Sequence, residues 1–183
     1  ATDAAGERSF TYWRDKAAAR EMFELDGAER AMAKAATASL LSFSLISLAI
    51  LPPSGRDRLL ALARRVRAEG GMVAFDGNYR PRLWSSPDEA RAVRDTAVAC
   101  ADIGLPTLED EAALSGAASA LEVADRWKAL GCGEVVVKLG ADGCLLPDGR
   151  QARPAERLQP VDTSGAGDAC NAGYLAGRMS GEA

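Results

Sequence analysis

The sequence has no histidine, only four cysteines and no excess of basic residues. Without histidine, Ser-His-Asp and Cys-His nucleophilic mechanisms are excluded, along with most zinc sites. Any proton transfer must therefore use a carboxylate, lysine, tyrosine or cysteine. The formal net charge is −4, and such a balance offers no basic surface for a phosphate backbone. We therefore expect no nucleic-acid partner.

Long hydrophobic runs and paired cysteines are missing as well. The longest uncharged stretch covers residues 35–55, but its strongly apolar part covers only residues 40–51, which is too short to cross a membrane. The N-terminus shows no secretory signal. A chain of 183 residues, 48% of them apolar, can bury a core without disulfide bonds, so we expect a cytoplasmic protein with free thiols and no membrane partner. The thiols are Cys100, Cys132, Cys144 and Cys170.

Strands and helices alternate along the chain, as the spacing of its apolar residues predicts. The predicted strands cover residues 7–14, 40–46, 72–75, 102–105, 134–139, 144–146 and 152–153. The predicted helices cover residues 26–38, 88–100, 108–114, 121–130 and 165–179, and one more runs from a cap at Ser54 to a stop at Gly70. This alternation is typical of a parallel sheet with helices on both faces. Ligands bind such folds at the carboxyl ends of the strands, which directs attention to the loops after Phe75, Val137 and Val161.

The most informative motif is Asp-Thr-Ser-Gly-Ala-Gly-Asp at residues 162–168, directly before the last predicted helix. Gly165 and Gly167 let backbone N–H groups approach a ligand closely, and a helix N-terminus favours an anion such as a phosphoryl group. Asp168, in the first helical turn, is placed to accept the proton of an attacking hydroxyl. The alternative is that the residues before Gly165 only cap a helix whose dipole Asp168 complements.

This motif resembles the Asp-Thr-x-Gly-Ala-Gly-Asp signature of the ribokinase-like (PfkB) family of carbohydrate kinases. The resemblance implies an α/β fold, a ribokinase-like three-layer α/β/α sandwich with a mostly parallel sheet. It implies that Asp168 is the catalytic base and that the backbone of Gly165, Ala166 and Gly167 forms the anion hole for the phosphoryl group of ATP. It also implies ATP and Mg²⁺ as cofactors, leaves a monovalent cation open, and suggests a homo-oligomer for the full-length protein.

A second motif, Asp-Gly-Asn-Tyr-Arg-Pro-Arg-Leu-Trp at residues 76–84, follows a predicted buried strand. An arginine guanidinium binds carboxylate or phosphate oxygens, and a neighbouring asparagine adds an orienting amide. Alternatively, the segment is a surface turn with two solvated arginines. It resembles the Asp-x-Asn-x-Arg-x-x-Leu-Trp segment of 2-keto-3-deoxygluconate kinases, a branch of the same family. The resemblance implies that Asn78 and Arg80 lie between a sugar acid and the nucleotide phosphates.

Residues 6–14 resemble the strand with which the same kinases hold their substrate, and the resemblance assigns Tyr12 and Arg14 to substrate binding. Arg14 stands on an otherwise apolar strand, where an unpaired charge is costly, so a substrate carboxylate is a suitable partner. The alternative is an arginine that faces solvent together with Tyr12.

Residues 137–144 place a strand before a turn with two glycines, and such turns are common. In the family the equivalent loop runs along the bound nucleotide. The resemblance therefore implies that Lys138, Gly140 and Gly143 bind ATP. An equally open alternative for Lys138 is a strand residue whose head reaches solvent.

One departure from the family concerns its Asn-x-x-Glu motif, which is tied to Mg²⁺ and phosphate. The matching positions here are Thr107 and Asp110. An aspartate can hold a hydrated Mg²⁺ through water, so Asp110 is the candidate metal residue.

The resemblance extends from Gly6 to Gly181, and members of the family are longer at both ends. We therefore expect residues 1–183 to be part of a ribokinase-like domain, with residues 7–14 in a lid and residues 26–183 in the core. The implied function is ATP-dependent phosphorylation of 2-keto-3-deoxygluconate at its primary hydroxyl. The alternatives are a kinase for a neutral sugar such as fructose or ribose, and a non-catalytic module that binds a ligand with the same fold.

Overall fold

The computed structural model of the chain describes residues 17–156 and 162–181. The predicted strand over residues 7–14, with Tyr12 and Arg14, lies outside the described residues, as does Val161.

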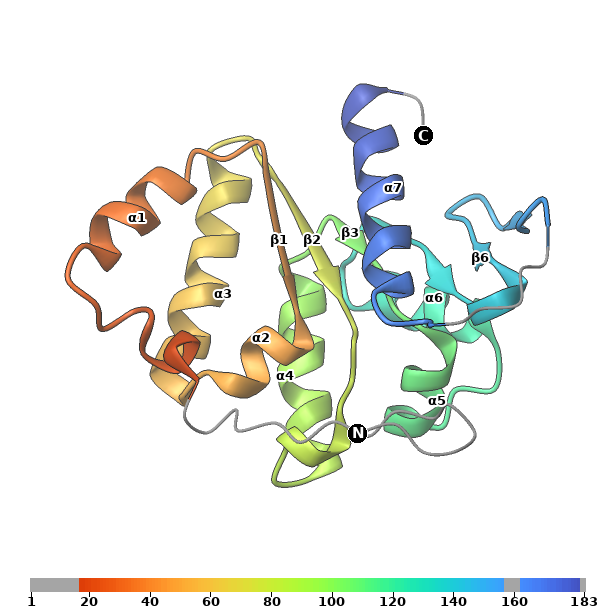
Figure 1. Ribbon diagram of the computed structural model, residues 1–183, viewed down its shortest axis with the longest axis horizontal. Helices are drawn as coiled ribbons and strands as arrows, with labels where there is room; N and C mark the ends of the chain where they lie inside the picture. The colour runs from red at the N-terminus through yellow and green to blue at the C-terminus, as the bar shows by residue number, and fades with distance from the viewer. Residues whose placement is uncertain (1–16, 157–161, 182–183) are drawn as a thin grey trace.

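Four parallel strands form the main sheet in the order β1-β2-β3-β4 (Figure 1). Their bounds are Leu40–Ser44, Met72–Asp76, Ile103–Gly104 and Glu134–Val135. Because each strand pairs with its neighbour in parallel, all four carboxyl ends lie at one edge of the sheet. The edge carries Ser44 and Asp76 side by side, since these two residues are partners in the β1–β2 register.

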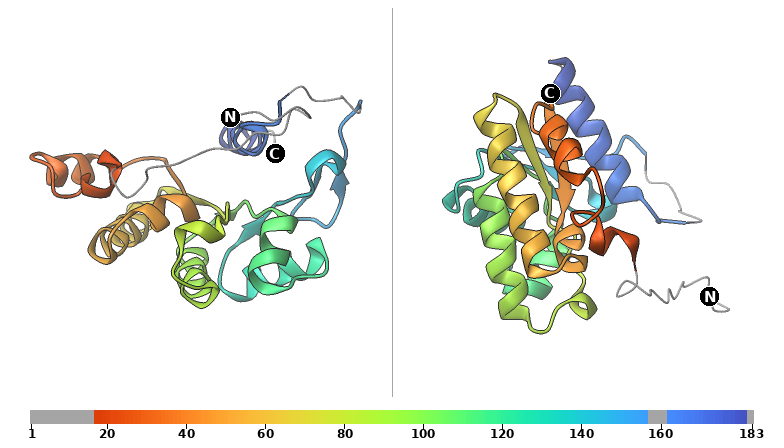
Figure 2. Two further views of the ribbon diagram at one scale, coloured as in Figure 1. Left: turned by 60° about the horizontal axis from the view of Figure 1, so that its bottom comes forward. Right: turned by 90° about the vertical axis from the view of Figure 1, so that its left-hand side faces the viewer.

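Helices cover both faces of this sheet. The bounds are Ala28–Ala35 for α1, Leu45–Ile50 for α2, Pro53–Ala68 for α3, Pro87–Ala99 for α4, Leu108–Ser115 for α5, Ala120–Ala129 for α6 and Ala166–Ser180 for α7. Figure 2 places α7 on one side of the sheet and α3, α4 and α6 on the other. The predicted three-layer α/β/α arrangement with a mostly parallel sheet is confirmed. Short 3-10 helices η2, η3 and η4 cover Ala18–Glu21, Pro81–Leu83 and Gly140–Asp142.

The predicted strand over residues 134–139 is wrong as a single element. It divides into β4 and β5 (Val137–Lys138), and β5 belongs to a separate antiparallel sheet with β6 (Cys144–Leu145) and β7 (Gln151–Ala152). Pro106 explains the division. Because proline has no backbone N–H, the segment after β3 cannot continue its hydrogen bonds to the segment after β4 beside Val136. Lys138 still donates its backbone N–H to the Pro106 carbonyl at 2.8 Å, so the chain direction continues across the break.

Several element bounds differ from those predicted by one to three residues, and two of the differences have a clear local cause. The strand expected to reach residue 46 ends at Ser44, and α2 begins at Leu45. The cause is a capping box, in which the side chains of Ser44 and Ser47 each accept the other's backbone N–H at 3.3 Å. Ser54 does not cap α3, which begins one residue earlier at Pro53, because a proline at the first helical position needs no N–H partner.

The larger apolar core lies between the sheet and α3, α4 and α6. Phe75 is fully buried there and stacks on Trp127 with 5.7 Å between ring centroids. Gly104 lies against the same indole, where an added Cβ would come within 2.6 Å of Trp127, so the site requires glycine. The four cysteines are free, as predicted. None of the described helices is long and apolar enough to cross a lipid bilayer.

Candidate active site

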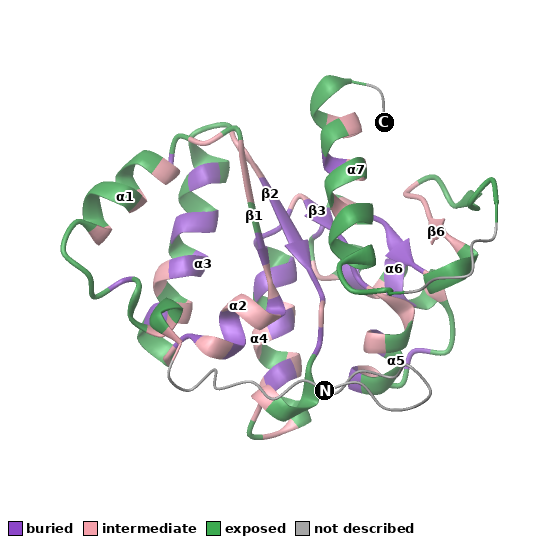
Figure 3. Cartoon of the chain, in the orientation of Figure 1, coloured by how far each residue is buried: buried purple, intermediate pink, exposed green. Residues whose placement is uncertain are grey.

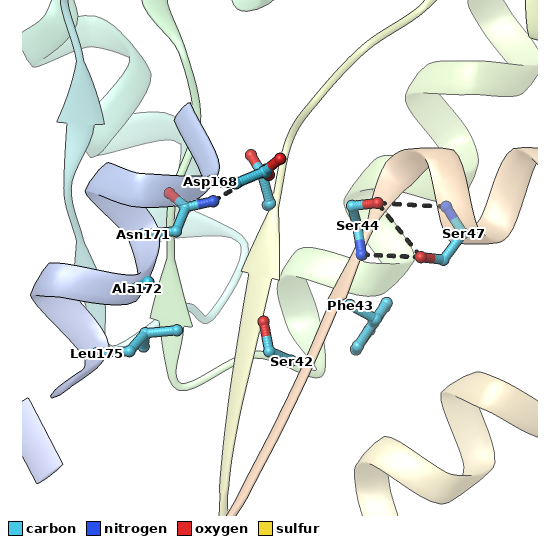
Figure 4. A pocket seen from close by; sticks show the side chains of 9 residues that line it. Ser42, Phe43, Ser44, Ser47, Asp168, Asn171, Ala172 and Leu175 are labelled. Carbon is cyan, nitrogen blue, oxygen red and sulfur yellow. Dashed lines mark hydrogen bonds between the residues drawn. The ribbon is translucent and has the colours of Figure 1, made fainter. Parts of the chain in front are cut away.

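A pocket of about 330 Å³ opens at the carboxyl ends of β1 and β2, beneath α7. Figure 4 shows Asp168, Asn171, Ala172 and Leu175 on the α7 side and Ser42, Phe43 and Ser44 on the side of β1. Ser47 and Asp76 complete the lining. The pocket therefore lies where ligands bind in open parallel sheets.

Asp168 stands in the first turn of α7 and is exposed to this pocket. Gly165 precedes the helix with a φ of 77°, a left-handed conformation that favours glycine. Ala166 donates its N–H to the Thr163 carbonyl at 3.1 Å, while no side chain of the described residues caps the helix. Ala169 donates its N–H to the Gly165 carbonyl at 2.8 Å, so among the described residues of this turn the N–H groups of Gly167 and Asp168 remain to bind an anion.

A buried polar network joins this helix to the sheet. The ammonium of Lys138 donates to Asp76 Oδ1 at 2.9 Å and to Asn171 Oδ1 at 3.0 Å. Asn171 Nδ2 in turn donates to Asp76 Oδ2 at 3.0 Å. Lys138 and Asp76 are each only 7% exposed. The head of Lys138 therefore does not reach solvent, and that alternative is wrong, whereas a contact of Lys138 with ATP stays a prediction.

The motif at residues 76–84 forms a second polar group next to the first. Asp110 accepts the backbone N–H of Tyr79 at 3.3 Å and the Arg80 guanidinium at 3.2 Å. Burial raises the pKa of Asp110, and the charge of Arg80 opposes that shift. Asn78 donates its backbone N–H to Asp76 Oδ1 at 3.3 Å, and its own buried Oδ1 has no partner among the described residues.

Gly140 and Gly143, the two glycines predicted to contact ATP in the turn after β5, have clear conformational roles. Gly140 begins η4 with a φ of 61°, and Gly143 ends the turn with a φ of 90°. A Cβ at Gly143 would come within 1.9 Å of the Ala152 carbonyl oxygen, so only glycine lets β6 and β7 approach here. Their contact with ATP stays a prediction.

The structure thus brings some predicted residues together and leaves others apart. Lys138 bonds to Asn171, which lies on α7 three residues after Asp168. A Cβ added at Gly167 would lie 3.9 Å from the Lys138 ammonium. Arg80 and Asp110 pair with each other rather than lining the pocket. Tyr12 and Arg14 lie outside the described residues.

Sequence reasoning missed roles for two residues of the network. The sequence pattern marks Asp76 only as the start of a motif and gives no role to Asn171. Asn171 follows Asp168 by three residues, a spacing that places both on one side of a helix and could have drawn attention to it. No pattern marks the pocket-lining serines of β1, Ser42 and Ser44, because their segment is otherwise strongly apolar.

Comparison with known proteins places this geometry in a family. The profile of the pfkB family carbohydrate kinases matches residues 1–183. The 2-dehydro-3-deoxygluconokinases of Escherichia coli and Dickeya dadantii are 45% and 46% identical to the chain, over 98% of its length. The match covers 60% of each of these relatives, so the chain spans about three fifths of their length.

Solved structures agree with the match in sequence. A PfkB protein of Polaromonas has 30% identity and a TM-score of 0.67, over 83% of this chain and 50% of its own. The aminoimidazole riboside kinase of Salmonella enterica, complexed with aminoimidazole riboside and an ATP analogue, has 37% identity and a TM-score of 0.63, over 71% of this chain and 44% of its own.

A double mutant of the Vibrio cholerae fructokinase, with bound fructose, ADP and potassium ion, has 33% identity and a TM-score of 0.64, over 74% of this chain and 44% of its own. With the parallel sheet, the uncapped glycine turn and the match over its whole length, this chain belongs to the pfkB family of carbohydrate kinases.

Proposed function

We propose that this chain forms the core of an ATP-dependent kinase for 2-keto-3-deoxygluconate, which is the 2-dehydro-3-deoxygluconate of its relatives' names. The observation that carries the proposal is the position of Asp168. Its carboxylate lines the pocket at the start of α7, directly after a glycine turn that leaves N–H groups for an anion. A base beside an anion site is the arrangement that phosphoryl transfer to a hydroxyl requires.

In the proposed reaction, Asp168 accepts the proton of the substrate's primary hydroxyl as that oxygen attacks the γ-phosphorus of ATP. The new O–P bond forms while the bond to the β-phosphate oxygen breaks, and ADP leaves with the bonding pair. Within the predicted anion hole at Gly165, Ala166 and Gly167, the Ala166 N–H already donates to the Thr163 carbonyl, so the N–H groups of Gly167 and Asp168 stabilise the negative charge on the transferred group. Each part has one task, and no covalent enzyme intermediate is needed.

The acid group of the substrate needs a cation. We assign it to Arg14 with Tyr12, and to Arg80, which is half exposed and can turn from Asp110 toward a ligand. The relatives with 45% and 46% identity act on a sugar acid by name, which supports this choice over a neutral sugar.

For ATP we propose contacts from Asn78, Arg80, Gly140 and Gly143, together with the glycine turn before α7. Lys138 is left out of this set, because its ammonium is buried against Asp76 and Asn171.

Magnesium enters this proposal only with the nucleotide. No cluster of three or more acidic, histidine or cysteine side chains within residues 17–156 and 162–181 could hold a metal ion. Mg²⁺ keeps most of its waters and binds chiefly to phosphates, so Asp110 fits it through water alone, and bound Mg²⁺ would neutralise phosphate charge. We place the kinase in the cytoplasm as a homo-oligomer, and leave a monovalent cation to be tested by adding and omitting K⁺ in the assay.

The test is a coupled ADP-release assay. It uses a protein that contains this chain and is as long as its relatives, called the full-length protein below. 2-Keto-3-deoxygluconate, its uncharged reduced analogue, fructose and ribose are compared side by side. We expect kcat/KM for the acid to exceed the others by at least about 10-fold, the effect of one charge-assisted hydrogen bond. Equal rates with the neutral sugars would favour the neutral-sugar kinase, and binding without ADP release would favour the non-catalytic module.

A further inference from the structure

Helix α7 is attached to the sheet by a small apolar contact. Leu175 is its single buried residue among those described, and most of the helix is exposed in Figure 3. Two polar anchors add to this contact. Asn171 bonds to Asp76 and Lys138 near the start of the helix, and Tyr174 and Arg178 bond to Glu134 of β4 toward its end.

The first anchor is a closed triangle of hydrogen bonds. Lys138 donates to Asp76 and Asn171, and Asn171 donates to Asp76, at distances of 2.9 to 3.0 Å. Because each member contacts the other two, none can move without breaking two bonds. The triangle joins the end of β2, the end of β5 and the second turn of α7, which are the three elements around the proposed site.

Asn171 controls what the helix presents to the pocket. It lies three residues after Asp168, so both side chains project from the same side of α7, and both line the pocket (Figure 4). Rotation of the helix by one residue, roughly 100°, would carry Asp168 off this side. Holding Asn171 against β2 therefore fixes the rotation of α7 about its axis.

Stability is a poor explanation for the triangle. A buried ion pair contributes little net free energy of folding, because the desolvation of both charges offsets their attraction. The Lys138 ammonium also lies beside Gly167 in the first turn of α7, where a cation opposes the helix dipole. An apolar contact would hold the helix at lower cost but would not fix its rotation.

We propose, on the basis of the function proposed above, that Asp76, Lys138 and Asn171 are positioning residues that hold α7 so that Asp168 faces the pocket. Lys138 then acts on the reaction through the helix and not by binding the nucleotide.

The experiment compares Asn171→Ala and Lys138→Met with the unaltered full-length protein. We expect kcat to fall about 10- to 100-fold, the usual result of a small misplacement of a catalytic group, with KM for ATP and for the sugar acid within about threefold. Hydrogen–deuterium exchange should increase in residues 162–172 while the sheet keeps its protection. Exchange that increases evenly throughout the chain would mean a merely structural network and would overturn the proposal.

Tyr174→Phe is the matched control. It removes a hydrogen bond to Glu134 from the other anchor of the same helix, so it costs similar stability away from the pocket. We expect its kcat to stay within about twofold of the unaltered protein. An equal fall in kcat for Tyr174→Phe would overturn a special role for the triangle. A KM for ATP raised more than about 10-fold in Lys138→Met, with kcat retained, would overturn it in favour of nucleotide binding.

Failure of the proposed function gives a different result. If the full-length protein phosphorylates fructose or ribose instead, the same comparison of kcat and KM is made with that sugar. Hydrogen exchange needs no substrate, so it tests the positioning role even if the protein shows no activity. Unchanged exchange in residues 162–172 of Asn171→Ala would overturn the positioning role, and a local increase would support it.

Discussion

The two faces of the four-stranded sheet differ in what covers them. The face toward α3, α4 and α6 carries the large apolar core, with Phe75 and Trp127 at its centre. The face toward α7 carries a small cluster around Leu175, an open pocket and the Asp76–Lys138 pair. One face supplies most of the burial that stabilises the fold, and the other holds the groups that can do chemistry. Substitutions on the two faces should therefore separate stability from activity.

The two faces also differ in what a buried ion pair does on each of them. Arg94 of α4 and Glu111 of α5 are both 2% exposed and bond to each other on the packed side. They join two helices that both contribute residues to the large apolar core. Asp76 and Lys138 instead join strand ends to a helix with few such contacts. The same interaction thus reinforces packing in one place and replaces it in the other.

The largest effect is expected on the packed face. Trp127→Ala removes a fully buried indole that stacks on Phe75, and should lower the free energy of unfolding by about 3–5 kcal/mol. Urea denaturation of the full-length protein measures it. Trp127→Phe is the control, because Trp127 Nε1 has no hydrogen-bond partner among the described residues and its removal leaves no lost bond. A loss below about 1 kcal/mol in Trp127→Ala would show that this face does not dominate stability.

Asp168→Asn should give the opposite pattern. We expect kcat to fall at least about 10²-fold, because the amide cannot accept the hydroxyl proton. The free energy of unfolding should hardly change, since Asp168 is exposed. Initial rates at saturating ATP and 2-keto-3-deoxygluconate, with a denaturation curve for the same sample, test both statements. Near-normal turnover would return Asp168 to the role of a residue that complements the helix dipole.

Leu175→Ala tests the sparse apolar contact of α7. Leu175 lines the open pocket, so its removal creates no enclosed cavity, and the loss should be about 2 kcal/mol, at the low end for a buried leucine. Urea denaturation beside Trp127→Ala gives the difference between the faces directly. A loss equal to that of Trp127→Ala would mean that α7 depends on apolar packing as much as the other helices do.

Local patterns predicted the main elements of the fold. Apolar spacing indicated the strands and helices of the parallel sheet, and the glycine turn indicated the start of α7, because these signals lie within a few neighbouring residues. The division at Val136 could not be predicted in this way. It depends on Pro106, which lies in the neighbouring segment of the sheet and has no effect on the local sequence of residues 134–139.

The polar network shows the same limit at the site. Asp76 and Lys138 are 62 residues apart, and Asp76 and Asn171 are 95 residues apart. No spacing rule connects residues so distant, and only the topology of the sheet brings them together. Asp168 could be predicted because one short motif, at residues 162–168, indicates its function. The residues that hold it in place come from three elements.

The smallest effect concerns Asp110 in the first turn of α5, which bonds to Tyr79 and Arg80 in the segment after β2. Burial raises its pKa, and Arg80 and the Tyr79 N–H oppose the shift only in part. The folded state therefore binds the proton more tightly than the unfolded state. The stabilising contribution is present below the unfolded pKa of about 3.9 and is lost as pH rises through the folded pKa.

Asparagine at position 110 does not titrate, so Asp110→Asn should become more stable relative to the unaltered protein as pH rises from about 4 to 7. The change should be the smallest of those predicted, because Arg80 and the Tyr79 N–H offset part of the effect of burial. Urea denaturation of both proteins at the two pH values measures it. A relative stability that falls with rising pH would mean that the pairing with Arg80 outweighs burial, and that Arg80 is fixed to Asp110 rather than free to turn toward a ligand.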